Sequence, residues 1–172
     1  MAGLHRVEAM LNESGASVTH LRAGYFMENY FFSLETIRSA GSVFLPVRGS
    51  TRIPMVATED IAEAAAMCFL DASWKGTRVR GVQGPRDLSF DEAAGILSDA
   101  LGRPVTHVTV LPTQARDGFV GLGATPDVAE KYTEMYQAFD SGTLKVAEAR
   151  SPETTTPTTL ADVARKMKPM LS

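Results

Sequence analysis

The chain has 172 residues, of which 44% are hydrophobic and 22% charged, which suits one soluble domain with a hydrophobic core. Its net charge of −3 offers no basic surface for nucleic acid or an anionic membrane, and no segment approaches the ~20 consecutive apolar residues of a membrane span. The charged first residues are unlike a signal peptide and a single cysteine fits a reducing compartment, so we expect a cytoplasmic protein.

The first third of the sequence predicts a helix, a strand and a second helix. Apolar residues recur at helical spacing within residues 3–14, and Gly15 ends that pattern. The segment "SVTHLR" predicts a strand over residues 17–22. After a short turn, residues 26–39 read as a helix that Gly41 ends. A junction of this kind, at the carboxyl end of a strand, is where open α/β proteins bind ligands.

Two short extended segments, "SVFLP" and "RIPMV", surround a turn at "VRGST". Proline cannot donate a hydrogen bond to a neighbouring strand, and each segment contains one, Pro46 and Pro54. We therefore expect both segments to form small edge pairings.

A strong helix follows over residues 59–71, with Thr58 as its predicted cap and acidic residues in its first turn. The only cysteine of the chain, Cys68, lies on its apolar face and is predicted to be a buried, inert thiol. The predicted buried stripe of this helix consists of Ile61, Ala65, Cys68 and Phe69.

The second half alternates strands and helices before it becomes helical. Residues 77–83 predict a strand, residues 89–101 a helix with a Ser89–Glu92 capping box and a terminal Gly102, and "PVTHVTVL" another strand. Helices follow over 113–121 and 126–139, the second with Thr125 and Pro126 as its first residues. A polar connection, "RSPETTTPTT", leads to a closing helix, "TLADVARKMKPML".

This order predicts an α/β fold with a parallel component. Only two long strands, 17–22 and 77–83, have the character of sheet members. Because a free-standing doubly wound sheet needs more strands, we expect a partial Rossmann-like sheet. We treat residues 1–172 as one domain, with sheet-derived elements over about 1–84 and a helical substrate lobe over about 85–172.

The usual signatures of metal and hydrolase sites are absent from the sequence. His5, His20 and His107 have no partner at ligand spacing, and strand histidines such as the last two are more often hydrogen-bonded structural residues. No Gly-x-Ser-x-Gly elbow and no Gly-x-x-x-x-Gly-Lys loop is present. We therefore predict no metal site and assign no catalytic residue.

The signatures of dinucleotide chemistry are also incomplete. The glycine-rich text "GFVGLGATP", residues 118–126, follows a helical pattern instead of a strand, so we interpret it as a connection between helices. None of the four tyrosines has a lysine four residues later, so the reductase pair Tyr-x-x-x-Lys is missing.

An aromatic face lies on the predicted helix 126–139. Helix core is the simpler interpretation, and the wall of a pocket for an apolar ligand is the sharper one. The residues on this face are Tyr132, Met135, Tyr136 and Phe139.

Three segments in series resemble the C-terminal half of NmrA-like proteins, which are atypical short-chain dehydrogenase relatives that bind NAD(P). They are "GLHRVEAMLNESGASVTHLRAGYFMENY", "IPMVATEDIAEAAA" and "GVQGPRDLSFDEAAGILSDALGRPV", in the family's order. The similarity covers nearly the whole chain, and the closing helix also matches.

The resemblance implies roles for particular residues. The loop after the first strand would pass beside the nicotinamide end of a bound cofactor, with Ala23 standing where the family usually has proline. The two helices 89–101 and 126–139 would belong to the lobe that covers the substrate cleft. The implied cofactor-side residues are Arg22, Ala23, Gly24, Tyr25 and Phe26. The implied substrate-pocket residues are Met27, Asn29, Tyr132, Tyr136 and Phe139.

The resemblance also implies what is missing. The family begins with a strand and a glycine-rich turn that holds the pyrophosphate, and neither precedes "GLHRVE" here. We therefore expect a truncated relative of NAD(P)H-dependent reductases or redox sensors, without dinucleotide binding or catalysis of its own. An exposed sheet edge and apolar faces on helices 3–14 and 59–71 predict a homo-oligomer, such as a dimer joined through that edge.

Two alternatives stay open at this point. The aromatic cleft formed by residues such as Tyr25 and Tyr136 predicts, on one alternative, a binding module for a small apolar ligand. On the other, the chain is a half-enzyme whose site is completed by a partner polypeptide that carries the glycine-rich half.

Overall fold

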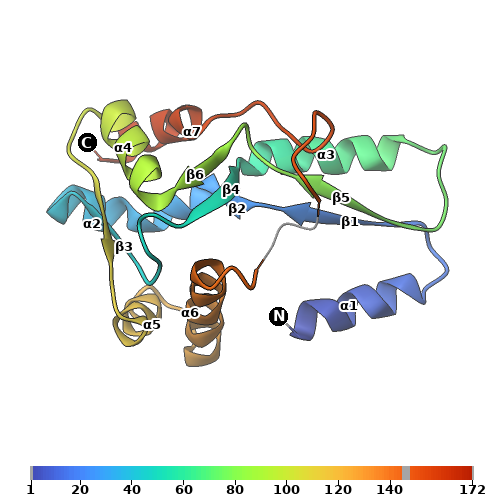
Figure 1. The fold of residues 1–172 in the computed structure, drawn as a ribbon, viewed down its shortest axis with the longest axis horizontal. Helices are drawn as coiled ribbons and strands as arrows, with labels where there is room; N and C mark the ends of the chain where they lie inside the picture. Colours follow the sequence, from blue (N-terminus) through green and yellow to red (C-terminus); the bar gives the residue numbers. More distant parts are fainter. Residues whose placement is uncertain (1, 145–147, 172) are drawn as a thin grey trace.

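The computed structural model describes residues 2–144 and 148–171 (Figure 1). Its α-helices are α1 (Ala2–Asn12), α2 (Leu34–Ala40), α3 (Thr58–Leu70), α4 (Phe90–Leu101), α5 (Pro112–Gly121), α6 (Pro126–Asp140) and α7 (Leu160–Met167). Its strands are β1 (Val18–Ala23), β2 (Tyr25–Phe26), β3 (Ser42–Leu45), β4 (Arg52–Val56), β5 (Thr77–Val82), β6 (Asp87–Ser89) and β7 (Thr106–Thr109). Two 3₁₀ helices, η1 (Met27–Ser33) and η2 (Lys168–Leu171), complete it.

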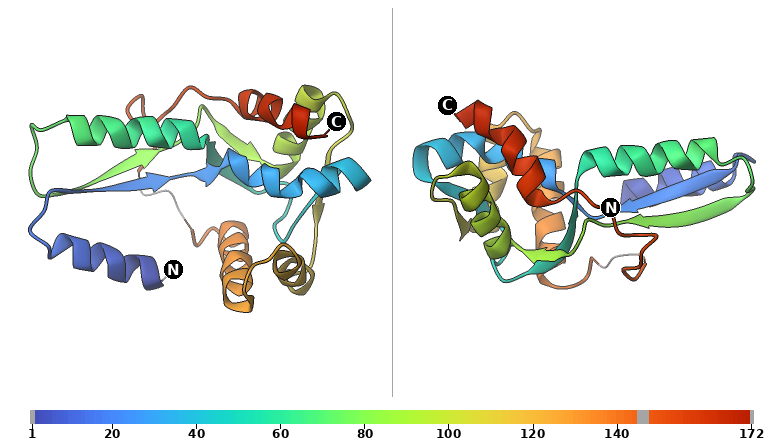
Figure 2. Two further views of the ribbon diagram at one scale, coloured as in Figure 1. Left: turned by 180° about the vertical axis from the view of Figure 1, so that it is seen from behind. Right: turned by 90° about the horizontal axis from the view of Figure 1, so that it is seen from above.

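The two long strands predicted from the sequence pair with each other. β1 and β5 are parallel, in register from Val18 opposite Thr77 to Ala23 opposite Val82. Helix α3 lies on one face of this pair and α1 on the other, as Figures 1 and 2 show from opposite sides. The α/β class with a parallel component is confirmed. Among the described residues, β1 has β5 as its one strand partner.

The outer edge of β5 is covered by the segment that precedes α7. Gln83, just beyond the strand, forms a parallel bridge with Thr155. Its backbone N–H donates to the Thr154 carbonyl, and its carbonyl accepts from the Thr156 N–H, each at 2.7 Å. The Glu148 carboxylate accepts from the backbone N–H of Gly81. The segment therefore occupies the outer backbone groups at the carboxyl end of β5, at Gly81 and Gln83.

The shorter strands form two further sheets. β3 pairs with β7 in parallel, and β4 lies between β2 and β6. The sequence-based placement of β4 at an edge is therefore wrong. The central position tolerates Pro54 because β6 pairs with residues 52–54 and β2 with residues 55–56, so the proline has a strand neighbour on one side alone.

The helix predicted over residues 26–39 is divided in the structure. Tyr25 and Phe26 form the short strand β2, a 3₁₀ helix follows over η1, and only α2 is α-helical. Gly41 ends α2 in the left-handed conformation, with φ of 61°, as predicted.

Helix α3 differs from its prediction at its N-terminal cap and along its apolar face. Thr58 is not its cap, because the N-cap residue is Ala57, which makes no side-chain cap hydrogen bond. Of the predicted buried stripe, Ile61 packs against the small core beside β1 and β5, but the end of the stripe is wrong. The side chain of Phe69 is 90% exposed, and Cys68 is half-buried with its sulfur 3.7 Å from the Arg80 guanidinium. The local apolar pattern predicted that these residues are buried, but no element in the described ranges covers this end of the helix face.

The predicted caps of α4 and α6 are confirmed. Ser89 and Glu92 form the capping box of α4, and Gly102 ends that helix in the left-handed conformation. The Thr125 hydroxyl accepts from the Val128 N–H at the start of α6, with Pro126 at the first helical position.

The main hydrophobic core joins elements from both halves of the chain. It packs α4 and α7 against η1, α2 and the short strands, with Phe90, Leu97 and Met167 each 1% exposed or less. Beside β1 and β5, the fully buried core consists of Val56, Ala64 and Val82. The long strand pair is thus the thinly packed part of the molecule. In the ranges 2–144 and 148–171 no helix is long and apolar enough to cross a membrane.

Candidate functional site

The strand junction after β1 is held close to β4 by two glycines. The Gly24 N–H donates to the Val82 carbonyl at 3.0 Å. A Cβ atom on Gly24 would lie 2.6 Å from the Pro54 carbonyl oxygen, and one on Gly84 would lie 1.9 Å from the Met55 carbonyl oxygen. Only glycine permits these approaches, so the carboxyl ends of β1 and β5 meet the β4 backbone directly.

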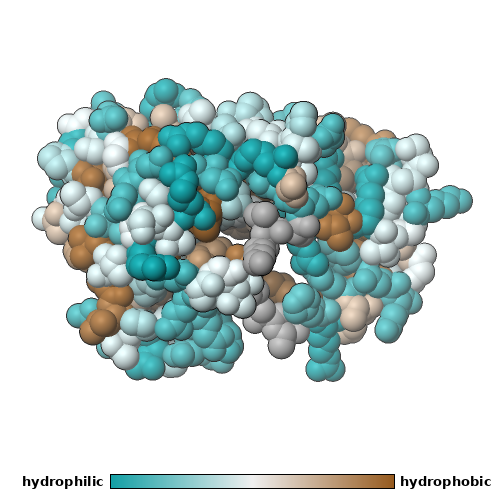
Figure 3. All heavy atoms as spheres, in the orientation of Figure 1, coloured by the Kyte–Doolittle hydropathy of each residue, from teal (hydrophilic) through white to brown (hydrophobic). Residues whose placement is uncertain are grey.

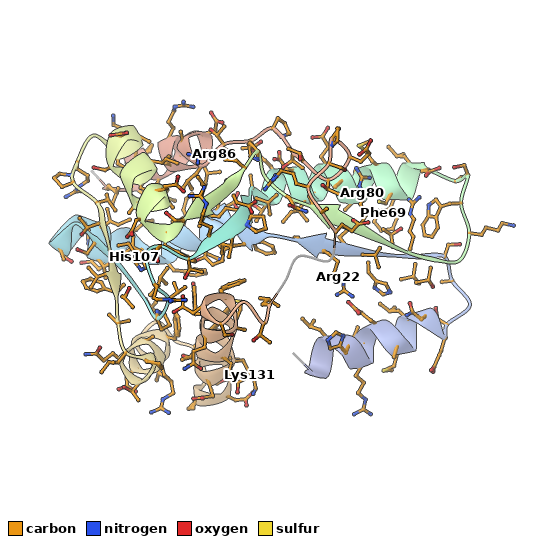
Figure 4. All side chains as sticks on the ribbon, viewed as in Figure 1. Arg22, Phe69, Arg80, Arg86, His107 and Lys131 are labelled. Carbon is orange, nitrogen blue, oxygen red and sulfur yellow. The ribbon has the colours of Figure 1, made fainter. Side chains whose placement is uncertain are left out.

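Arg22, which closes β1, is engaged by α1. Its guanidinium forms a two-pronged ion pair with the Glu8 carboxylate, in which Nη2 donates to Oε2 at 2.8 Å. Figure 4 shows the Arg22 side chain directed from β1 toward α1. The hydrogen bonds from Arg22 lower the pKa of Glu8. In this arrangement the charge of Arg22 is neutralised by a residue of the same chain.

Tyr25 and Tyr136 meet at the centre of the aromatic cluster. Their phenolic oxygens lie 2.8 Å apart, and the two side chains are 6% and 4% exposed. The Tyr25 ring packs edge-on against Phe90 and Phe139, with centroids 5.6 and 6.2 Å away. Burial raises the pKa of both tyrosines, while the neighbouring Tyr136 and Asn29 side chains offset part of the rise for Tyr25. Both hydroxyls therefore stay protonated at neutral pH.

The other residues predicted for the substrate pocket are divided between core and surface. Met27 is 1% exposed, and Phe139 packs beside Tyr25 and Tyr136. Tyr132 is 48% exposed, and its ring lies 5.6 Å from that of Phe119. Phe26, predicted for the cofactor side, is 42% exposed. Tyr25, Tyr136 and Phe139 are thus brought together, whereas Tyr132 lies toward the α5–α6 surface. Their role as the lining of a ligand cleft stays a prediction.

The N-terminus of α3 is capped by a residue that sequence analysis missed. Both carboxylate oxygens of Glu28 accept from the Thr58 N–H, each at 3.0 Å. Glu28 belongs to η1, and 30 residues separate it from Thr58, so no local sequence pattern reports the contact. Asp60 in the same turn is 5% exposed and accepts from the Thr158 N–H and hydroxyl. The start of α3 thereby anchors both η1 and the segment before α7.

The start of α4 and that of α7 also carry carboxylates. The Ser89 N–H and the Arg52 side chain hold the pKa of Glu92 at about 2. The Thr159 hydroxyl and N–H hold the pKa of Asp162 at about 2. Free amides at a helix N-terminus bind phosphate well, but at these two termini the Ser89 and Thr159 amides already donate to a carboxylate. A phosphate there would meet the negative charge of Glu92 or Asp162.

The strand histidines are hydrogen-bonded, as the sequence predicted. His20 Nε2 lies 2.8 Å from the Asn12 side-chain oxygen, and His107 Nε2 lies 2.9 Å from the Val47 carbonyl oxygen. Within the described ranges, no three His, Cys, Asp or Glu side chains come together as a metal site would require.

Two open hollows flank the β1–β5 pair, and sequence reasoning predicted neither. One, of about 370 Å³, lies between β1 and the second half of α3 and is lined in part by Leu21, Cys68 and Trp74. The other, of about 660 Å³, lies over β5 and the segment that covers its edge. Neither hollow is lined by a predicted pocket residue of α6.

Comparison with known proteins gives one consistent result. The model of the NmrA-like family matches residues 2–163. The chain is 32% identical to an NAD(P)H azoreductase of Xenophilus azovorans over 75% of this chain and 44% of that protein. It is 32% identical to an agroclavine dehydrogenase of Claviceps purpurea over 72% of this chain and 43% of that protein. The chain thus spans less than half the length of these relatives.

Solved structures show the same fold. An NADPH-dependent quinone oxidoreductase of Escherichia coli superposes with a TM-score of 0.76 at 24% identity, over 94% of this chain and 59% of that one. The triphenylmethane reductase of Citrobacter superposes with a TM-score of 0.73 at 21% identity, over 95% of this chain and 57% of that one.

Proposed function

The chain is a member of the NmrA-like family, and from that premise we propose that it forms the nicotinamide-side and substrate-side part of an NAD(P)H-dependent reductase. We further propose that it does not hold the dinucleotide by itself. The relationship to NAD(P)H-dependent reductases is supported by the azoreductase and dehydrogenase relatives.

One observation carries the second part of the proposal. At the N-termini of α3, α4, α6 and α7 at least one backbone amide donates to a side chain of this protein, and at α3, α4 and α7 a carboxylate is an acceptor. Binding energy for a dinucleotide comes largely from helix-terminus amides around the pyrophosphate. Because an amide at each of α3, α4 and α7 donates to Glu28, Glu92 or Asp162, we expect another part of an active assembly to supply the phosphate-binding wall.

The residues at the strand junction would then position the reacting groups. When bound, an NAD(P)H cofactor supplies the hydride. The close contacts of Gly24 with the Pro54 carbonyl and of Gly84 with the Met55 carbonyl fix the position of residues 22–26 beside β4. The neutral, buried hydroxyls of Tyr25 and Tyr136 tie that loop to α6, so the lobe and the loop would form one wall.

Titration of the purified chain with NADPH tests this proposal. Calorimetry should show no saturation below about 1 mM, which corresponds to about 4 kcal/mol of binding free energy. The E. coli quinone oxidoreductase, whose structure is also known in complex with NADPH, is the positive control in the same buffer. Micromolar binding of NADPH by this chain would contradict the proposal.

A further inference from the structure

The outer edge of β5, on the side away from β1, carries free backbone groups along its first half. The Gly24 N–H donates to the Val82 carbonyl at 3.0 Å, so the even-numbered residues of β5 direct their backbone groups toward β1. The odd-numbered residues Thr77 and Val79 therefore direct theirs outward, and no residue in the described ranges bonds them there. Unpaired groups of this kind accept an added strand.

The segment before α7 shows that an extended chain adds to this same edge. We call residues 148–156 the covering segment. Gln83 forms a parallel bridge with Thr155 and makes two backbone hydrogen bonds of 2.7 Å to the residues on either side of it. The Glu148 carboxylate accepts from the Gly81 N–H. The pairing with the covering segment thus has strand geometry, and it stops short of Val79.

The hollow of about 660 Å³ opens beside the unpaired groups. Its lining includes Arg78, Val79 and Arg80 of β5, Met67 of α3 and part of the covering segment. Successive side chains of a strand point to opposite faces, so Arg78 and Arg80 lie on the α3 face and Val79 on the other. On the side of the molecule that carries β5, hydrophobic atoms lie among hydrophilic ones (Figure 3). A chain extended along this edge would therefore meet charged and apolar side chains in alternation.

Arg80 has hydrogen-bond donors to spare in this hollow. Its guanidinium donates to the Cys68 sulfur at 3.7 Å, on the α3 side of β5 (Figure 4), and it forms no ion pair with a carboxylate of the described chain. Arg78, by contrast, pairs with Asp71 and lies 3.9 Å over the Trp74 ring. A guanidinium has five N–H donors, and a carboxylate can accept two of them together. Arg80 can therefore bind a carboxylate that this chain does not supply.

We propose that the outer edge of β5 at Thr77 and Val79, with the hollow beside it, binds an extended peptide segment of another protein that carries an acidic side chain. The peptide adds to β5 as a strand, and its backbone bonds the outward groups of Thr77 and Val79. Its carboxylate pairs with Arg80 on the α3 face, and its neighbouring apolar residues contact Val79 on the other face. This interaction goes beyond the proposed reductase function and does not depend on it.

A peptide fits these observations better than a small acid or a second copy of the chain. A small carboxylic acid would pair with Arg80 but leave the outward groups of Thr77 and Val79 unbonded. A second copy joined through the same edge would bring its own Arg78 and Arg80 across from these, and like charges across a strand pair are unfavourable. The covering segment, in contrast, already shows an extended chain bonded to this strand.

NMR titration of the full chain tests the proposal with a defined probe. The probe is acetyl-Thr-Val-Glu-Val-Thr-amide, in which the glutamate and the two valines point to opposite faces of a strand. We expect chemical-shift changes and slower hydrogen exchange at the Thr77 and Val79 amides. The Arg78 amide, which is directed toward β1, should change little. Replacing the glutamate of the peptide by lysine leaves the protein unaltered and should weaken binding about tenfold.

Variants of the chain supply the second arm. Arg80→Gln should weaken binding of the glutamate peptide about tenfold, and Arg86→Gln is the matched control, because Arg86 pairs with Glu92 at the start of α4. The proposal is overturned if millimolar peptide shifts no amide of β5, or if the lysine peptide binds as tightly as the glutamate peptide. It is also overturned if glutarate alone causes the same shifts at the same concentration, or if the chain without peptide shows them through self-association.

Discussion

The phenolic oxygens of Tyr25 and Tyr136 form a 2.8 Å hydrogen bond across 111 residues of sequence. The bond joins β2, at the strand junction, to α6 in the C-terminal lobe. Because both side chains are more than nine-tenths buried, loss of either hydroxyl removes a hydrogen-bond partner that water cannot readily replace. The pair therefore links the two parts of the candidate site.

Removing both hydroxyls should cost less than the sum of the two single losses. Tyr25→Phe or Tyr136→Phe leaves the remaining hydroxyl buried without this partner, and we expect a loss of about 1–3 kcal/mol in the free energy of unfolding. The double variant should be closer to the native protein than the sum of the two losses, since it leaves neither oxygen behind. Urea unfolding of all four proteins measures the cycle, and additive losses would contradict a direct bond.

Gly24 and Gly95 should respond oppositely to alanine. A Cβ atom at residue 24 would press on the Pro54 carbonyl oxygen, so Gly24→Ala should cost about 1–3 kcal/mol through forced backbone shifts. Gly95 lies on the exposed face of α4 with nothing within 4 Å of a Cβ atom, so Gly95→Ala should stabilise by about 0.5–1 kcal/mol. Thermal unfolding followed by circular dichroism distinguishes the two, and equal effects would refute the close approach at Gly24.

The parts of the fold that follow from the sequence are those with local signals. The Ser89–Glu92 capping box, Gly102 after α4 and the Thr125–Pro126 pair each act within one helical turn, and each is where the pattern predicted it. The two long strands were also recognisable from their own residues. Local propensity and local hydrogen bonding decide these features.

The parts that sequence reasoning missed depend on distant residues. Pro54 indicated an edge strand, yet β4 is central because its two neighbours pair with different halves of it. Phe69 continued an apolar helical pattern, yet its side chain is 90% exposed, because burial depends on what packs against a helix face and not on the pattern alone. At the candidate site, aromatic residues on α6 were recognisable, but no pattern indicated that Tyr136 bonds Tyr25.

Glu28 should stabilise α3 specifically. Glu28→Ala removes the carboxylate that accepts from the Thr58 N–H, and we expect a loss of about 0.5–2 kcal/mol, as for other helix caps. Amide exchange should accelerate first at Thr58. Glu35→Ala is the control, because Glu35 forms an exposed pair with Arg38 and should change stability by less than about 0.5 kcal/mol. Equal losses for both variants would refute a capping role.

Stability should fall as the solution becomes acidic, in part because of Glu92. The backbone N–H of Ser89 and the Arg52 side chain lower the pKa of Glu92 from 4.5 to about 2 in the folded protein. Between these values the unfolded chain binds a proton that the folded chain does not, so the contribution of Glu92 is present above pH 4.5 and lost as the pH falls toward 2. Glu92→Gln keeps a capping side chain without the charge, and its urea midpoint should therefore decline less over this range. Glu134→Gln, which removes an exposed carboxylate bonded to Lys131, is the control. A Glu92→Gln protein with the native pH profile would show that this carboxylate does not contribute to acid sensitivity.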